Sequence, residues 1–293
     1  MNAEEILKKV RRIEIISRKS SQEIFAGEYH SAFKGRGMEF SEVREYTEGD
    51  DVRFIDWNVS SRMGRLYVKQ FVEERELTVI LAIDLSASLN FFSKDKSKKE
   101  IAAEICAIIA FTASLNNDKV GLVIFTDQVE RFVPPKKGRT HILRIIREIL
   151  NFQPKSKGTS IDNCLVYLNK VIKKKAILFL LSDFIDTDFQ LSMKIAARKH
   201  DLIAVKISDL RENMLPKSGM FILRDHETGE DFFVDFSSKK TRAAFKNDYR
   251  EKESRLLESF KKYEVDYIFI DSEKEYEKPL FDFFMKRRKK FVR

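Results

Sequence analysis

The chain has 293 residues, 43% of them hydrophobic and 12% aromatic, so it can bury a sizeable core and is not a disordered polypeptide. Its net charge of +9 permits nucleic acid, anionic membrane or acidic protein partners and does not choose among them. The two cysteines, Cys106 and Cys164, lie in apolar helical patterns without a Cys-x-x-Cys pair or a Cys/His cluster, which excludes a disulfide framework and a cysteine-based metal site.

Residues 1–76 are expected to form an N-terminal region with one helix and a small β-rich part. Ile6, Val10 and Ile13 fall on one face of a helix. The stretch that follows is dense in Gly, Asp and Arg and alternates in short segments such as LYVKQFVEE, a pattern that favours a small sheet with tight turns. The start has no apolar segment typical of a signal peptide, and no apolar run reaches the length of a bilayer span, about 20 residues, so we expect a cytoplasmic protein without a transmembrane segment.

Charged residues gather in the segment REYTEGDDVRFIDWNVSSR of this region. We expect its arginines to pair with its aspartates and thereby to join the small sheet to the main domain. The residues concerned are Arg44, Arg53, Arg62, Asp50, Asp51 and Asp56. Trp57 is expected to anchor a core. The alternative interpretation of the segment is a surface that docks a partner.

Residues 77–293 are expected to form an α/β domain with a doubly wound, mostly parallel sheet. Five apolar runs have the length and near-continuous hydrophobicity of strands that are buried on both faces: LTVILAID, KVGLVIFTD, KAILFLLSD, DLIAVKIS and VDYIFID. Helical patterns lie between the runs, and this alternation predicts the doubly wound sheet. The run VERFVPP is expected at an edge, because its prolines cannot donate to a strand ladder.

The alternation is interrupted at about residues 210–236. Two strand-like runs flank the sequence HETGE there, which predicts a hairpin insertion. A long charged helix follows, and the chain ends in a short helix with the basic sequence FFMKRRKKFVR. We expect this basic sequence to be a solvated helix end, with Phe281 and Phe284 packed on the sheet, rather than a contact with membrane or nucleic acid.

Oxygen-bearing side chains follow two of the apolar runs. Asp84, Ser86 and Ser88 end the first run, Asp183 ends LFLLSD, and Thr159 follows a glycine at a helix start. Ligands of open α/β sheets bind at the carboxyl ends of strands where the winding reverses, so we expect these five side chains to converge. Two carboxylates and three hydroxyls, without nitrogen or sulfur, suit Mg²⁺, or alternatively Mn²⁺ or Ca²⁺, better than zinc. For Asp-x-Ser-x-Ser alone, the simpler interpretation is a helix cap.

The set Asp84-Leu85-Ser86-Ala87-Ser88, Gly158-Thr159 and Ser182-Asp183 resembles the metal-ion-dependent adhesion site of von Willebrand factor A domains. The resemblance implies a von Willebrand factor A-like fold in which Ser86, Ser88 and Thr159 touch the ion. It further implies that Asp84 and Asp183 often act through water, and that an acidic residue of a protein partner completes the coordination.

The segment GRGMEFSEVREYTEGDDVRFIDWNVSSR strongly resembles the bacterial family called domain of unknown function 58. The residues that carry this resemblance are Gly35, Gly37, Arg44, Tyr46, Gly49, Asp50, Asp51, Arg53, Ile55, Asp56 and Trp57. Members of the family commonly accompany MoxR-type AAA+ ATPases and are thought to act with them in the assembly or activation of other proteins. The resemblance covers most of the chain and is weakest in the hairpin insertion and the last helix.

Together these features predict a metal-dependent protein-interaction module that is not an enzyme and whose partner is a MoxR-type ATPase or its client. The alternative is a Mg²⁺-dependent hydrolase that uses the same cluster. Ser86 stands where a phospho-aspartate enzyme needs a second carboxylate, and no Gly-x-Ser-x-Gly, Walker A or dinucleotide motif is present. A nucleic-acid binder rests on charge alone, and we expect no nucleic-acid contact.

Overall fold

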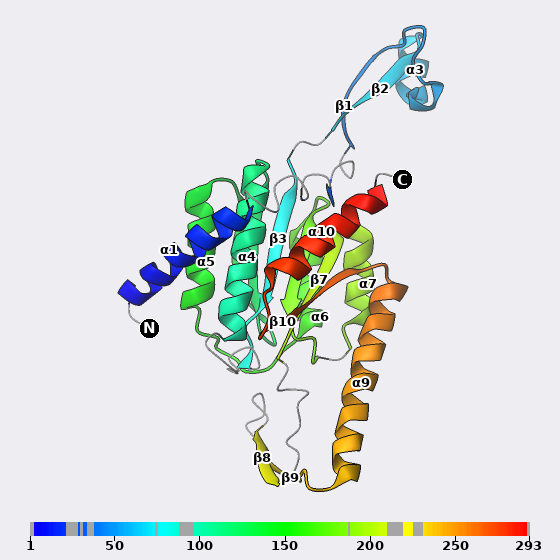
Figure 1. The fold of residues 1–293 in the computed structure, drawn as a ribbon. Coiled ribbons are helices and arrows are strands. Elements are labelled where there is room, and N and C mark those ends of the chain that lie inside the picture. Colours follow the sequence, from blue (N-terminus) through cyan, green and yellow to red (C-terminus); the bar gives the residue numbers. More distant parts are fainter. Residues whose placement is uncertain are drawn as a thin grey trace. The chain divides into compact units, whose positions relative to one another are not determined.

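The chain consists of two compact units, which are described separately. The structure, a computed structural model, describes residues 3–21, 29, 32–33, 38–73, 76–87, 97–186, 188–209, 219–224 and 231–291. The smaller unit comprises Phe33–Leu77, and the larger unit comprises Met1–Ala32 together with Thr78–Arg293. Figure 1 shows the elements of both units.

The larger unit is built around a six-stranded sheet with the strand order β10-β7-β6-β3-β4-β5. Its strands are β3 (Thr78–Asp84), β4 (Lys119–Phe125), β5 (Val129–Lys136), β6 (Ile177–Ser182), β7 (Asp201–Ser208) and β10 (Asp266–Asp271). Neighbouring strands pair in parallel except for β4 and β5, which pair antiparallel. The predicted fold class is therefore confirmed, and the run with the two prolines forms the expected edge strand.

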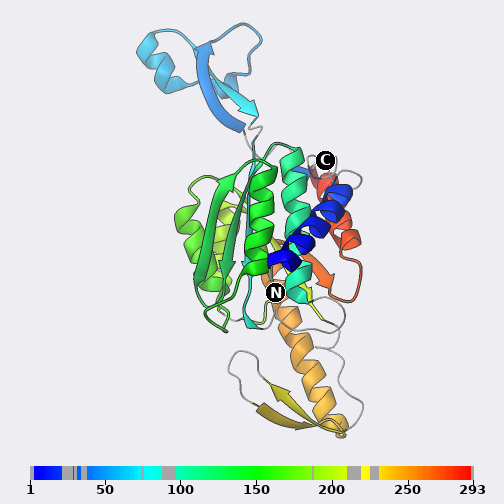
Figure 2. The ribbon, with the colours of Figure 1, turned by 90° about the vertical axis from the view of Figure 1, so that its left-hand side faces the viewer.

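The apolar runs form strands that helices cover on both faces. Every residue of β6 is buried, and β3 and β4 are buried beyond their first residues. On one face, α6 (Ile161–Val171), α7 (Gln190–Lys199) and the end of α9 (Lys239–Lys262) enclose a continuous apolar core. On the other face lie α4 (Lys98–Leu115) and α5 (Arg139–Asn151), as Figure 2 shows. Burial on both faces explains why the runs of β3, β4, β6 and β7 lack the alternation of half-exposed strands. The expectation is wrong for the edge strand β10, where Ile268 and Ile270 are buried and Phe269 is exposed.

Helix α1 (Ala3–Ser20) belongs to the larger unit, although the sequence placed residues 1–76 in one N-terminal region. Its side chains Val10 and Ile13 are buried, and the helix packs on α4 and α5. The hydroxyl of Ser21 donates to the carbonyl oxygen of Ile108 at 3.2 Å, and the Thr112 hydroxyl donates to the Ser21 hydroxyl at 3.0 Å. The prediction of an apolar stripe is confirmed at Val10 and Ile13, but the stripe packs on helices far along the chain, which a local change in composition cannot reveal.

The smaller unit contains the predicted small sheet. Strand β1 (Met38–Glu45) pairs antiparallel with β2 (Tyr67–Glu73), and η2 (Val52–Phe54) and α3 (Trp57–Met63) lie between them in the chain. The Asp56 carboxylate caps α3 by accepting from two backbone N–H groups of its first turn. Gly64 ends α3 with φ of 68°, a left-handed conformation that glycine adopts without strain.

The expected hairpin insertion is also present. Strands β8 (Met220–Arg224) and β9 (Asp231–Asp235) pair antiparallel as a sheet of their own, and the long charged helix α9 follows. Within the described part of the chain, no helix has both the length and the apolar character that crossing a bilayer requires.

The C-terminal helix α10 (Glu277–Phe291) agrees with the expectation of a solvated basic end at Lys286 and Lys289, which are exposed, but not at Arg287. Phe284 is buried as expected, and its ring lies 5.9 Å from that of Tyr29. Arg287, however, is only 2% exposed and pairs with Asp201 and, at 3.0 Å, with Asp266. Because it lies three residues after Phe284, it falls on the apolar face of the helix, and carboxylates at the starts of β7 and β10 receive its charge.

Replacing Arg287 with Met should lower the free energy of unfolding by about 3–5 kcal/mol, because it leaves buried Asp201 without this cation. Chemical denaturation measures the effect. Lys286→Met, at an exposed position of the same helix, is the matched control and should stay within about 0.5 kcal/mol of the unaltered protein. Equal denaturation midpoints for the two variants would show that Asp201 does not depend on the guanidinium.

Candidate metal centre

The carboxyl ends of β3 and β6 meet where the sheet reverses its winding direction. The chain runs from β3 to β4 and β5 on one side, and then returns to β6 on the other side of β3. Ile83 is the register partner of Leu181, which places Asp84 beside Ser182. Crevices at such switch points are where open α/β sheets bind their ligands.

Asp84 is held in place by both strand ends. Its side chain is fully buried, and one carboxylate oxygen accepts a hydrogen bond from the N–H of Ser86 at 2.9 Å. The other oxygen accepts from the hydroxyl of Ser182 at 2.8 Å. That hydroxyl in turn accepts from the N–H of Phe184 at 3.1 Å. The turn after β3 and the last residue of β6 therefore fix the orientation of this carboxylate.

The surroundings of Asp84 disfavour its charged form. Burial raises the pKa of Asp84 to about 7, and the negative charge of Asp183 contributes to the rise, whereas the hydrogen bonds from Ser86 and Ser182 oppose it. Burial, and to a smaller extent the charge of Asp84, also raises the pKa of the Cys164 thiol, which makes it an unreactive core side chain. A cation between the two carboxylates would remove their mutual repulsion.

Asp183 has a buried oxygen that lacks a hydrogen-bond donor. Its Oδ1 atom accepts from the N–H of Ile185 at 3.4 Å, whereas its Oδ2 atom accepts no hydrogen bond from a described residue. The Nζ atom of Lys98 lies 3.7 Å from that Oδ2, and the two side chains are 0% and 2% exposed. A buried carboxylate oxygen without a donor is costly, so this oxygen is a place where a bound cation would be stabilising.

The loop that carries Thr159 is joined to the same edge of the sheet by backbone hydrogen bonds. The N–H of Ala87 donates to the carbonyl oxygen of Lys157 at 3.1 Å. The N–H of Ser160 donates to the carbonyl oxygen of Thr126, directly after β4, at 2.8 Å. Thr159 lies between these two anchors and is half-buried. The loop is therefore positioned beside the turn that follows β3.

The structure describes four of the five predicted ligands, and Ser88 lies outside the described residues. Asp84, Ser86 and Asp183 are buried at the carboxyl edge between β3 and β6, with the loop of Thr159 beside them. Their roles as metal ligands remain a prediction.

The oxygen chemistry of these residues fits a hard divalent cation. No group of three or more His, Cys, Asp or Glu side chains that could hold a metal ion occurs in the described ranges. An ion at this edge would therefore need hydroxyl or water oxygens in addition to the two carboxylates. Such an all-oxygen set suits Mg²⁺ better than zinc.

Sequence reasoning did not predict Lys98 or Ser182 as ligands or partners in this site. Lys98 stands in the charged run KDKSKKE, which is typical of a solvated helix start. The available signal was periodicity: Lys98 precedes Ile101 by three residues and Ile105 by seven, a spacing that places all three on one helical face. A lysine on an apolar face needs a buried partner, and Asp183 is that partner here.

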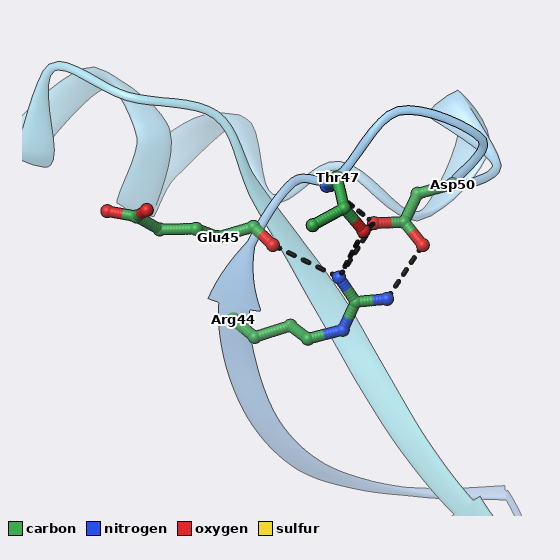
Figure 3. Close-up of polar contacts among 4 residues, drawn as sticks. All are labelled: Arg44, Glu45, Thr47 and Asp50. Carbon is green, nitrogen blue, oxygen red and sulfur yellow. Dashed lines mark hydrogen bonds and ion pairs between the residues drawn. The ribbon is translucent and has the colours of Figure 1, made fainter.

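The polar contacts of the smaller unit stabilise a tight turn. Arg44 pairs with Asp50 through hydrogen bonds of 2.8 and 2.7 Å and also donates to the carbonyl oxygen of Glu45 and the hydroxyl of Thr47 (Figure 3). The bonds from Arg44, and after them those from Thr47, hold the pKa of Asp50 well below its ordinary value. This predicted ion pair is therefore present and closes the turn after β1.

The other predicted pairs are present only in part. Arg53 pairs with Asp51 at 2.6 Å. Asp56, however, lies 3.6 Å from the ammonium of Lys69 rather than pairing with an arginine. Arg62 forms no ion pair with a residue that the structure describes.

Trp57 is exposed, so the prediction of a core anchor is wrong. Its exposed fraction is 67%, and Val52 and Met63 are also more than half exposed. In α3, which starts at Trp57, only Ser60 is buried. The smaller unit therefore presents aromatic and apolar side chains close in sequence to Arg62, a composition that is common at protein interfaces.

Comparisons with known proteins place the chain among relatives of unknown function. The model of the family described as protein of unknown function DUF58 matches residues 42–255. The uncharacterized protein Rv1480 of Mycobacterium tuberculosis is 28% identical over 231 residues, which cover 77% of this chain and 73% of the relative.

Matches to solved structures were also found. The conserved hypothetical protein BatB of Bacteroides thetaiotaomicron is 15% identical with a TM-score of 0.45, and the match covers 73% of this chain and 99% of that one. Proximal thread matrix protein 1 from the mussel byssus, in a structure with a zinc-occupied MIDAS motif, is 19% identical with a TM-score of 0.37, and the match covers 45% and 38% of the two chains.

The affinity for Mg²⁺ should rise as the pH rises toward 7 and level off above it. Metal binding needs the charged form of Asp84, whose pKa is raised to about 7 in the protein without metal, so binding at lower pH must release a proton. Calorimetric titration at pH 6 should give a dissociation constant about tenfold weaker than at pH 8, with a heat that depends on the ionisation enthalpy of the buffer.

The raised pKa of Asp84 also determines how the stability of the metal-free protein changes with pH. Since the pKa of Asp84 is raised on folding, the protonated carboxyl stabilises the folded state at low pH, and this contribution is lost as the pH rises through about 7. Asp84→Asn, measured in chelator, is the control and should lack this loss. For the preceding prediction about metal binding, equal Mg²⁺ affinity at pH 6 and pH 8 would be the contradicting result.

Proposed function

We propose that this chain, which belongs to the family described as protein of unknown function DUF58, is a metal-dependent protein-interaction module. Mg²⁺, or alternatively Mn²⁺ or Ca²⁺, would be held by Asp84, Ser86, Ser88, Thr159 and Asp183. The observation that carries the proposal is the buried Oδ2 atom of Asp183, which lacks a hydrogen-bond donor among the described residues and lies at the same strand edge as Asp84.

The charge of the cluster supports a carboxylate as the group that the ion recognises. The two aspartates, when ionised, carry a summed charge of about −2, which only just balances the charge of a divalent ion, and the hydroxyl ligands are neutral. Mg²⁺ prefers six oxygen ligands and usually keeps several waters, so an incoming Asp or Glu can replace one of them. An acidic side chain of a protein partner would supply charge and complete the coordination sphere.

The partner in this proposal is a MoxR-type AAA+ ATPase or its client. This part rests on the sequence resemblance, which links family members with such ATPases in the assembly or activation of other proteins. A cytoplasmic location and the absence of catalysis by this chain belong to the same proposal.

The positions of the described histidines weigh against a hydrolase at this edge. The Nε2 atom of His141 lies 2.9 Å from the carbonyl oxygen of Val120, at the start of β4. The Nδ1 atom of His200 accepts from the N–H of Ala176, just before β6. Both imidazoles therefore lie at the amino ends of the strands, away from Asp84, and neither could act as a general base there. His30 and His226 lie outside the described residues.

Loss of the ion should abolish binding of a purified MoxR-type AAA+ ATPase. Asp84→Ala removes a carboxylate of the cluster and should eliminate Mg²⁺ binding in calorimetry, whereas Thr159→Ala removes one neutral ligand and should weaken it about tenfold or more. In an immobilised-protein binding assay, both variants should bind the ATPase correspondingly less. The ion concentration is kept constant, because the ATPase needs Mg²⁺ for its own nucleotide.

Ser156→Ala is the matched control, because it lies in the loop of Thr159 and only its backbone N–H bonds to Glu130. This variant should bind both Mg²⁺ and ATPase normally. Unchanged ATPase binding by Asp84→Ala and Thr159→Ala would show that the cluster is not the contact. The exposed side chains of the smaller unit would then be tested with Trp57→Ala and Arg62→Glu, rather than through Arg44, whose loss would disrupt the turn it closes.

A further inference from the structure

Lys98 is a buried cation at the candidate metal centre. Its side chain is 0% exposed, although lysine is among the residues that are least often buried without a partner. Its Nζ atom lies 3.7 Å from Oδ2 of Asp183, the same oxygen that accepts no hydrogen bond from a described residue. The ammonium is therefore close enough to offset the charge of Asp183, but it is beyond normal hydrogen-bond length.

The position of Lys98 on its helix is not explained by helix stability. It is the first residue of α4, directly after the cap Ser97, whose hydroxyl accepts from the N–H of Glu100. Cations are disfavoured at this end of a helix, where the macrodipole is positive, and Glu100 already supplies the favourable charge. A lysine placed at this position and turned inward is better explained by the carboxylate that it meets.

The ammonium and a divalent ion would compete for the same oxygen. With Lys98 in place, the charges of Asp84, Asp183 and Lys98 sum to about −1, instead of about −2 for the two carboxylates alone, when all are ionised. An ion bound through Asp183 would also experience direct repulsion from the ammonium, in surroundings where charges are weakly screened. Both effects weaken metal binding.

We propose that Lys98 is a built-in counter-cation of the metal centre, which stabilises Asp183 when no metal is bound and lowers the affinity of the site for divalent ions. The inference rests on the proposed metal site and adds a residue that regulates it. A centre of this kind keeps its domain folded without metal. It also favours occupation when another anion, such as a partner's carboxylate, contributes to holding the ion.

The test compares the unaltered protein with Lys98→Met, which keeps the apolar stem and removes the charge. Lys99→Met is the matched control, since it removes a neighbouring charge whose Nζ donates instead to the carbonyl oxygen of Phe152 at 2.7 Å. Mg²⁺ affinity is measured by calorimetry, and thermal unfolding is measured in chelator and in excess Mg²⁺. We expect Lys98→Met to bind Mg²⁺ about tenfold more tightly or better, since a like charge near the ion has been removed.

Thermal unfolding provides an independent measure of how much the pair of Lys98 and Asp183 stabilises the folded protein. In chelator, Lys98→Met should melt at a lower temperature than the unaltered protein, and Mg²⁺ should raise its melting temperature by more. Adding Asp183→Asn to Lys98→Met should restore much of the stability, because no buried charge is then left alone. Should Lys98→Met fail to fold in chelator, this double variant still decides the matter: recovery of folding would support the proposal, and a double variant that also fails to fold would overturn it.

The outcomes also separate this inference from the proposed function. Equal Mg²⁺ affinity of Lys98→Met and the unaltered protein would overturn the role of Lys98 and leave the metal site standing. Binding by Lys98→Met but not by the unaltered protein would support the counter-cation and refute metal dependence of the native module. Absence of Mg²⁺ binding in both would overturn both.

Discussion

Two buried carboxylates at neighbouring strand ends are the constraint around which one edge of the larger unit is arranged. Parallel pairing of β3 and β6 brings Asp84 and Asp183 to the same edge, and both are nearly inaccessible to water. Each would pay a large desolvation cost as an unaccompanied ion. The groups around them reduce that cost: the N–H of Ser86 and the hydroxyl of Ser182 for Asp84, and the ammonium of Lys98 for Asp183. The sheet topology creates an unfavourable charge pair, and the neighbouring residues only partly offset it.

The smaller unit is stabilised mainly by surface polar contacts rather than by a buried core. A segment of the length of Phe33–Leu77 cannot enclose a substantial core, so polar contacts at its surface define its turns. The two parallel hydrogen bonds between Arg44 and Asp50 are of the bidentate kind that fixes geometry as well as charge. The same shortage of interior leaves Trp57 exposed. Sequence alone predicted the turn correctly, because turn chemistry is local, and misplaced the tryptophan, because burial depends on how much core the unit can form.

The sequence predicted the sheet well because strands that are buried on both faces leave a direct record in apolar runs. It also predicted that Asp84 and Asp183 end neighbouring strands, since motif and topology agreed there. The errors in the helices of the larger unit share one cause. Helix α1, Arg287 and Lys98 all owe their positions to partners far along the chain: α4 and α5, Asp201, and Asp183, respectively. A basic or amphipathic helical pattern shows which face of a helix is apolar, but not which other element packs on it. Charged residues that lie on buried faces were therefore interpreted as solvated.

Arg287 and Lys98, both buried cations of the larger unit, show how differently such pairs can be used. Arg287 joins two carboxylates at the amino ends of β7 and β10, one of them at 3.0 Å, and thereby attaches α10 to the sheet. Lys98, at the carboxyl edge, lies 3.7 Å from an oxygen that still lacks a hydrogen bond from the described residues. A guanidinium held between two carboxylates resists exchange, whereas a longer contact to a flexible ammonium leaves the carboxylate open to a stronger cation. At the amino ends of the strands, the pairs of Arg287 with Asp201 and Asp266 thus suit a structural role. At the carboxyl ends, the pair of Lys98 with Asp183 suits replacement of the ammonium by a metal ion.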